Sequence, residues 1–170
     1  MGGVSATHSA KERAVRHRMR RWSVRNARGL KKLYSAIEQI LVWCHPLLRR
    51  IGFARLDKPF MKVESLTKGF LLDSQNCGQC IVGFTGLSCP MNCPKKMRNG
   101  PCGGVRPDGN CEVKPEMPCV WVLAWEGNQR LREEEIPLQV VQPPVDHQLI
   151  GRSAWLREVR ILVEGDNRAV

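Results

Sequence analysis

Apolar residues recur at spacings of three and four along residues 30–51, which is typical of one apolar face of an α-helix. They are Leu30, Leu33, Tyr34, Ile37, Ile40, Leu41, Cys44, Leu47, Leu48 and Ile51. Pro46 interrupts this segment, and we expect it to kink or divide the helix because its ring removes one backbone donor and crowds the preceding turn. A helix so apolar on one side needs a partner surface.

A second amphipathic segment follows at residues 52–73. Its apolar residues again have helical spacing: Phe60, Val63, Leu66, Phe70 and Leu71. No stretch approaches the roughly 18 apolar residues needed to cross a bilayer, because charged residues or glycine interrupt each candidate. We therefore predict an amphipathic helical docking region over residues 30–72 and no transmembrane segment.

Residues 77–118 are rich in glycine and proline, so regular structure is largely excluded there. Asp108-Gly109 predicts a tight turn. Residues 120–126 are expected to form a short helix or strand that ends at Gly127, with Trp121 and Trp125 in the core. We expect a small fold of α-helices and irregular segments. N-terminal helices lead into a loop-rich, metal-stabilised Cys domain over 73–127, and an extended C-terminal tail follows over 128–170.

The charge of the chain is uneven. The sequence carries 27 Lys and Arg against 16 Asp and Glu, a net charge of +11, and residues 1–55 hold all of this excess. Residues 1–29 are predicted to form a basic N-terminal arm, which could bind nucleic acid, an anionic membrane surface or an acidic partner protein, or remain a solvated arm.

Cysteine is concentrated in one region. Seven of the eight cysteines are the candidate metal ligands: Cys77, Cys80, Cys89, Cys93, Cys102, Cys111 and Cys119. Packing gives no reason for such a cluster, so the thiols should be bonded to zinc, to iron-sulfur or to one another. Disulfides are disfavoured because the chain opens on a polar stretch without the apolar core of a secretory signal. We therefore expect a cytoplasmic protein. Cys44, the eighth cysteine, is expected to be a buried core thiol.

The spacing of the cysteines does not decide between zinc and iron-sulfur. Only Cys77 and Cys80 form a CxxC pair, whereas a zinc ribbon has two such pairs about 15–20 residues apart. The Cys-Pro steps at Cys89 and Cys93 resemble the proline that follows a cluster ligand in bacterial ferredoxins. Seven ligands divide into four plus three. The candidates for an eighth are Ser74, Asp73, a histidine and Cys44.

Several cysteine-containing blocks occur in a characteristic order: residues 86–95, beginning Gly-Leu-Ser-Cys-Pro, residues 98–105, around Gly-Pro-Cys-Gly-Gly, and residues 110–121, ending Met-Pro-Cys-Val-Trp. They resemble the methylenetetrahydrofolate reductase C-terminal domain family over roughly residues 70–127. The resemblance implies a small accessory subunit that accompanies a flavin-dependent catalytic reductase subunit in folate one-carbon metabolism. It also implies one or two iron-sulfur clusters of the 4Fe-4S type, or zinc in their place, and a role in electron transfer. Related sequences carry a further cysteine where Ser74 stands.

Catalytic residues are not evident within the chain. The four histidines, His8, His17, His45 and His147, are far apart, and no third group completes a nucleophile arrangement. The leading hypothesis is therefore a non-catalytic iron-sulfur subunit whose 30–51 helix docks the reductase. The alternative is a zinc-stabilised structural or nucleic-acid-binding module with a basic arm, although that arm has few interleaved aromatics and nucleic acid is the less favoured partner.

Overall fold

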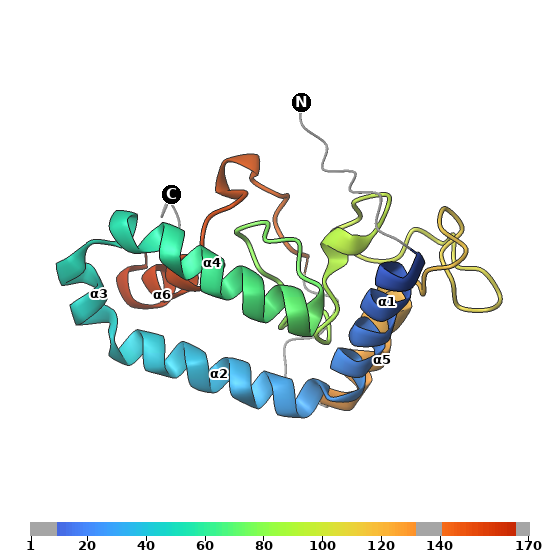
Figure 1. Cartoon of the computed structure of the whole chain (residues 1–170), viewed down its shortest axis with the longest axis horizontal. Helices are drawn as coiled ribbons and strands as arrows, with labels where there is room; N and C mark the ends of the chain where they lie inside the picture. Colours follow the sequence, from blue (N-terminus) through green and yellow to red (C-terminus); the bar gives the residue numbers. More distant parts are fainter. Residues whose placement is uncertain (1–9, 132–140, 166–170) are drawn as a thin grey trace.

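The computed structural model describes residues 10–131 and 141–165, and these form a mainly helical fold (Figure 1). The six α-helices are α1 (Ala10–Arg25), α2 (Ala27–Trp43), α3 (His45–Ile51), α4 (Phe53–Leu72), α5 (Val120–Leu131) and α6 (Ala154–Glu164). Two 3-10 turns, η1 (Pro90–Asn92) and η2 (His147–Leu149), lie in the connections. The described residues contain isolated β-bridges but no strand. The expected small, mainly helical fold is confirmed, and the described residues between α4 and α5 contain no α-helix.

The helical segment 30–51 is divided close to Pro46, as expected. α2 ends at Trp43, and Pro46 lies in the first turn of α3, where its missing N–H costs no helical hydrogen bond. Gly52, at φ 99°, then separates α3 from α4. Cys44 lies at the junction of α2 and α3 and is half-buried, so it is not the fully buried core thiol that we expected.

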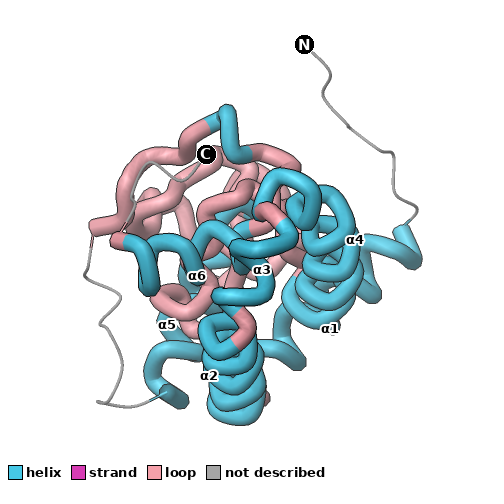
Figure 2. The backbone as a smooth tube through the Cα atoms, turned by 90° about the vertical axis from the view of Figure 1, so that its left-hand side faces the viewer, coloured by secondary structure: helices cyan, strands magenta, loops and turns pink. Residues whose placement is uncertain are grey.

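The helices pack in two groups around the loop segment. α1 packs against α4 and α5, while α6 packs against both α2 and α4 (Figures 1 and 2). The basic N-terminal segment is therefore not a solvated arm over residues 10–25, because α1 buries Ser23 and Val24 at its C-terminal end. Residues 1–9 of the predicted arm lie outside the described residues.

α4 confirms the second predicted helix, but most of its predicted apolar stripe does not face the core. Val63, Leu66 and Phe70 are 57%, 75% and 71% exposed, whereas Leu71 packs against the core. The buried positions are Glu64, Lys68 and Leu72. A charged pair at i and i+4 thus occupies the interior face, and three of the apolar residues lie outside.

The C-terminal part of the chain is more helical than expected. Ala154–Glu164 form α6, capped by the Ser153 hydroxyl, which accepts a hydrogen bond from the Leu156 N–H at 3.3 Å. The prediction of an extended tail is therefore wrong for these residues, because α6 buries Trp155, Leu156 and Val159. Residues 132–140 and 166–170 of that tail lie outside the described residues.

Residues 120–131 form a helix that continues through Gly127, where we expected an end. A Cβ at Gly127 would overlap the backbone of Gly86, so this glycine permits close approach of α5 to the loop segment. Trp121 is buried as expected, but Trp125 is 58% exposed and does not belong to the core. No helix in the described ranges is both long enough and apolar enough to span a membrane.

Candidate metal centre

Backbone hydrogen bonds close a series of turns in the loop segment between α4 and α5. Cys111 N–H donates to the Met117 carbonyl at 2.9 Å, and Cys119 N–H donates to the Gly109 carbonyl at 3.0 Å. The predicted turn at Asp108-Gly109 is confirmed, with the Gly109 N–H donating to the Arg106 carbonyl at 2.9 Å. These hydrogen bonds place Cys111 and Cys119 on two adjacent stretches of the backbone.

Three of the seven candidate ligands share one small cavity. Cys77, Cys80 and Cys89 line a narrow hollow of about 10 Å³, which has room for about one water molecule. The loop that carries the first two approaches η2 closely, because a Cβ at Gly78 would overlap the carbonyl of Leu149. Gly78 has φ 72°, which favours glycine, so the CxxC turn depends on it both for conformation and for space.

The same cavity bears on the question of an eighth ligand. Ser74 lines the cavity beside the three cysteines. Asp73, the adjacent candidate, is buried but occupied: its carboxylate accepts hydrogen bonds from Arg16 Nη1 at 3.2 Å and Arg20 Nε at 2.7 Å. Those ion pairs attach α1 to the end of α4. Of these two candidates, Ser74 is the one placed with the thiols.

Arg98 also lines the cavity and is 7% exposed. Its Nε donates to the Pro143 carbonyl at 2.7 Å and its Nη2 donates to the Gln79 carbonyl at 3.0 Å. Its Nη1 is buried without a hydrogen-bond partner among the described residues. A buried donor of this kind costs free energy unless it finds an acceptor, so the guanidinium is suited to a bound anionic group.

A buried ion pair lies on the α4 side of this site. Lys68 Nζ is 2.6 Å from Glu64 Oε1, and Glu64 Oε2 accepts further hydrogen bonds from the Ser153 hydroxyl and the Trp155 N–H. Burial alone would lower the pKa of Lys68, but the negative charge that Cys80 and Glu64 can carry outweighs it and raises that pKa above its usual range. Lys68 therefore remains a cation close to Cys80.

Burial raises the pKa of the Cys89 thiol to about 11, although backbone hydrogen bonds from Gln75 and Met91 oppose the shift. The nearby Cys80 and Cys77 raise it further, because neighbouring thiolates repel one another. A metal that bound here would have to displace this proton, so its binding would release a proton.

The other four candidate ligands lie apart from this cavity. Cys93 and Cys111 share an apolar cluster with Met97, and Cys119 belongs to an adjoining cluster that Met97 also contacts. Cys102 is exposed, and its Sγ accepts a hydrogen bond from the Gly104 N–H at 3.4 Å. Three of the candidate ligands thus line one hollow, three more lie in the apolar clusters that Met97 contacts, and Cys102 lies at the surface.

No group of three or more His, Cys, Asp or Glu within residues 10–131 and 141–165 is arranged to hold a metal ion. The donor set nevertheless fits iron-sulfur in kind, because clusters are held by cysteine thiolates. A cluster also spaces its ligands more widely than a single ion does, since iron and sulfide atoms lie between them. An anionic group in the cavity would give Arg98 Nη1 the hydrogen-bond acceptor that it lacks among the described residues.

Sequence reasoning missed Glu64 and Lys68. Their i, i+4 spacing is an ordinary surface pattern, and only the packing of α6 over α4 buries them.

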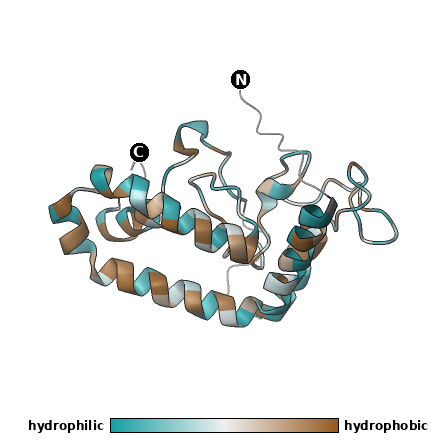
Figure 3. Cartoon of the chain, in the orientation of Figure 1, coloured by the Kyte–Doolittle hydropathy of each residue, from teal (hydrophilic) through white to brown (hydrophobic). Residues whose placement is uncertain are grey.

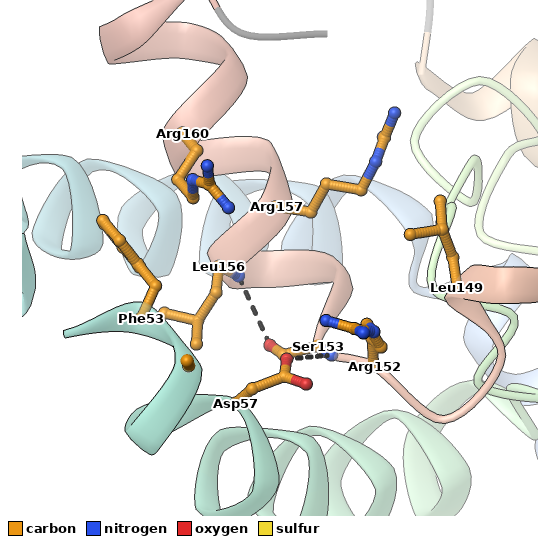
Figure 4. Close-up of a pocket in the computed structure, with 9 residues that line it drawn as sticks. Phe53, Asp57, Leu149, Arg152, Ser153, Leu156, Arg157 and Arg160 are labelled. Carbon is orange, nitrogen blue, oxygen red and sulfur yellow. Dashed lines mark hydrogen bonds between the residues drawn. The ribbon is translucent and has the colours of Figure 1, made fainter. Parts of the chain in front are cut away.

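A further pocket lies between the start of α4 and the start of α6 and contains none of the cysteines. Phe53, Asp57, Leu156 and Arg160 are among its lining residues, with Arg152 and Arg157 at its edges (Figure 4). Asp57 Oδ1 accepts a hydrogen bond from the Ser153 N–H at 2.9 Å, so this carboxylate fixes the beginning of α6.

The six helices and the cysteine-rich loop segment define a small helical protein with a candidate metal centre. No catalytic residues are recognisable among those described. Residues 53–148 match the family model described as methylene-tetrahydrofolate reductase C terminal. The match covers more than half of the chain, which therefore belongs to that family, as the cysteine blocks indicated. It extends beyond those blocks to include all of α4 and the first two residues of η2. Searches of curated proteins and of solved structures find no match.

Proposed function

We propose that this protein is a non-catalytic iron-sulfur subunit that transfers electrons within a flavin-dependent methylenetetrahydrofolate reductase complex. The family links the chain to folate metabolism and suggests association with a reductase subunit. The observation that carries the iron-sulfur part is the shared cavity of Cys77, Cys80 and Cys89, beside the unpartnered Nη1 of the buried Arg98.

In this proposal, Cys77, Cys80 and Cys89 would hold one group, with Ser74 on the same cavity as a candidate fourth ligand. Cys93, Cys102, Cys111 and Cys119 would hold a second. When bound, an iron-sulfur cluster supplies one-electron transfer. Lys68 and Arg98 supply positive charge beside the first site, which favours the more negative, reduced state.

The identity of the bound metal decides between this function and a purely structural zinc subunit, because thiolates bind zinc as well as iron-sulfur clusters. The test is to purify the full chain without oxygen and to measure iron, zinc and acid-labile sulfide together with the visible spectrum. Iron, sulfide and a visible absorption that dithionite bleaches are expected. A colourless protein containing only zinc would contradict the electron-transfer role.

Two variants assign the site. Cys80→Ser should lower the iron and sulfide content, because it removes a thiol from the cavity. Cys44→Ser is the matched control, since Cys44 lies at the α2–α3 junction and does not line the cavity. Equal metal loss in both variants would show that the cavity thiols are not the ligands.

The partner is tested with the catalytic flavoprotein. The dithionite-reduced subunit, freed of excess reductant, should reduce the flavin of the reductase when the two are mixed, as the loss of flavin absorbance reports. A metal-loaded subunit that neither binds the flavoprotein nor reduces its flavin would contradict the proposed partnership.

A further inference from the structure

A segment from the C-terminal part of the chain lies against the loop that carries Cys77 and Cys80 (Figure 1). This segment, residues 141–151, is called the strap below. Three of its backbone N–H groups donate to the residues around the CxxC turn: Gln142 to Asn99 Oδ1 at 2.7 Å, Asp146 to Gln79 Oε1 at 2.9 Å, and Gly151 to the Asn76 carbonyl at 3.3 Å.

The strap is attached by hydrogen bonds more than by burial. Hydrophilic and hydrophobic residues are mixed along it (Figure 3). Leu149, whose carbonyl lies over Gly78, is the one buried residue within 141–151, while Val141 and Ile150 are 80% and 55% exposed. A segment that buries so little apolar area has low local stability, so a few hydrogen bonds decide whether it stays in place.

Arg98 joins the strap to the cavity of the three thiols. Its Nε donates to the Pro143 carbonyl in the strap, and its Nη2 donates to the Gln79 carbonyl in the CxxC turn. Arg98 also lines the cavity and is 7% exposed, and its Nη1 has no hydrogen-bond partner among the described residues. One buried guanidinium thus contacts the strap and the CxxC turn and keeps one donor nitrogen unused.

The unused donor would find its acceptor when the cavity is loaded. A zinc ion or an iron-sulfur cluster that is held by three thiolates carries a net negative charge. Bound beside Arg98, such a group accepts from Nη1, and the guanidinium is then held in the orientation that also serves Pro143 and Gln79.

We infer that Arg98 couples metal binding in this cavity to attachment of the strap. Coupling of two equilibria is reciprocal: if the metal holds the strap in place, the strap must retain the metal by the same factor. Arg98 is therefore a positioning residue, and contacts of the strap far from the thiols contribute to metal retention. The inference rests on the proposed function only in that these thiols hold a metal, whichever metal it is.

The sharpest test removes a strap contact that does not line the cavity. Asn99 is exposed and forms two hydrogen bonds of 2.7 Å with the backbone of Gln142. Release of metal from the full metal-loaded chain is timed with the coloured chelator pyridylazoresorcinol, and the kinetic phase that Cys80→Ser removes belongs to this cavity. Asn99→Ala should speed that phase on the order of tenfold, the size expected from two ordinary hydrogen bonds.

Asn26→Ala is the matched control. Asn26 is also exposed and donates to a backbone carbonyl, that of Trp22 at 2.9 Å, but it lies at the α1–α2 junction away from the strap. Its release rate should equal that of the wild-type protein. Arg98→Lys keeps the positive charge but loses the planar fork, so it should speed release at least as much as Asn99→Ala.

Hydrogen exchange measures the reverse direction of the coupling. The amides of Asp146 and Gly151 should exchange more slowly in the metal-loaded chain than after the metal is stripped, with amides within α2 as the internal reference. In Arg98→Lys this difference should disappear, whereas Asn99→Ala should retain it. If the stripped chain loses its helical circular dichroism, the release rates of the loaded variants decide alone.

Equal release rates for Asn99→Ala and Asn26→Ala would overturn the inference. So would faster exchange of the strap in the metal-loaded chain, which would mean that the bound group displaces the strap. A chain that holds only zinc would contradict the electron-transfer role and leave this test unchanged, so the inference and the proposed function fail separately.

Discussion

Replacing Lys68 by methionine tests the ion pair that Lys68 forms with Glu64 within α4, on the face of this helix that α6 covers. Lys68 and Glu64 have side chains only 3% and 6% exposed, and their charged atoms are 2.6 Å apart. The ammonium also lies 5.2 Å from the Tyr34 ring centroid and 5.0 Å from that of Trp155. Methionine has a similar length but no charge, so Glu64 would be left as a buried carboxylate without its cation.

The expected loss is about 3–5 kcal/mol of unfolding free energy, the usual cost of removing one partner of a buried pair. The hydrogen bonds that Glu64 accepts from Ser153 and Trp155 place the loss toward the lower end of that range, because they still stabilise part of its charge. For a domain whose total stability is about 5–15 kcal/mol, such a loss is large but measurable.

Urea unfolding of the full chain, followed by helical circular dichroism at matched metal content, measures this loss. The double variant Glu64→Gln, Lys68→Met should recover most of it, because it leaves no unpaired charge and the amide oxygen still accepts from Ser153 and Trp155. A loss below about 1 kcal/mol for Lys68→Met, or no recovery in the double variant, would refute this account of the pair.

The pair also predicts a dependence on pH. The folded-state pKa of Lys68 lies above its usual value of 10.5, so the folded protein holds this proton more tightly than the unfolded chain does. The stability that Lys68 contributes is therefore fully present below about pH 10.5 and is lost as the pH rises further. The difference between the wild-type protein and Lys68→Met should stay constant across neutral pH and shrink in alkaline solution.

Three further predictions concern other parts of the fold. Gly78→Ala should destabilise the protein by more than about 2 kcal/mol in urea unfolding and lower its metal content, because the new Cβ overlaps backbone at positive φ; normal metal content would contradict the role of the CxxC turn. Asp73→Asn should speed proteolysis within α1, because two arginines of α1 lose their anionic partner; an unchanged cleavage rate would show that α1 is held by packing alone. Burial and the nearby Glu38 raise the pKa of Glu158, so its contribution to stability falls as the pH rises above about 4.5. Glu158→Gln should therefore be more stable at pH 7, by less than about 1 kcal/mol since the site is partly solvated, and a less stable variant would reverse this sign.

The amino-acid sequence alone was enough to predict amphipathic helices within 30–51 and 52–73, the division near Pro46 and the glycine- and proline-rich cysteine segment. These follow from local rules: apolar spacing, the missing N–H of proline and the turn preferences of glycine. The family was also evident from the cysteine blocks alone. Local patterns of this kind survive in the structure because each depends on neighbours within a few residues.

The buried face of α4, by contrast, depends on how the helices pack against one another. Val63, Leu66 and Phe70 have the spacing of a core stripe, yet α6 packs against the opposite side of α4 and buries Glu64 and Lys68. The hydrophobic effect depends on area removed from water and not on sequence spacing, so a stripe does not specify what covers it. The same reasoning applies to the thiols, because the cavity is assembled by Gly78 against Leu149 and by Arg98, residues that are distant in the chain.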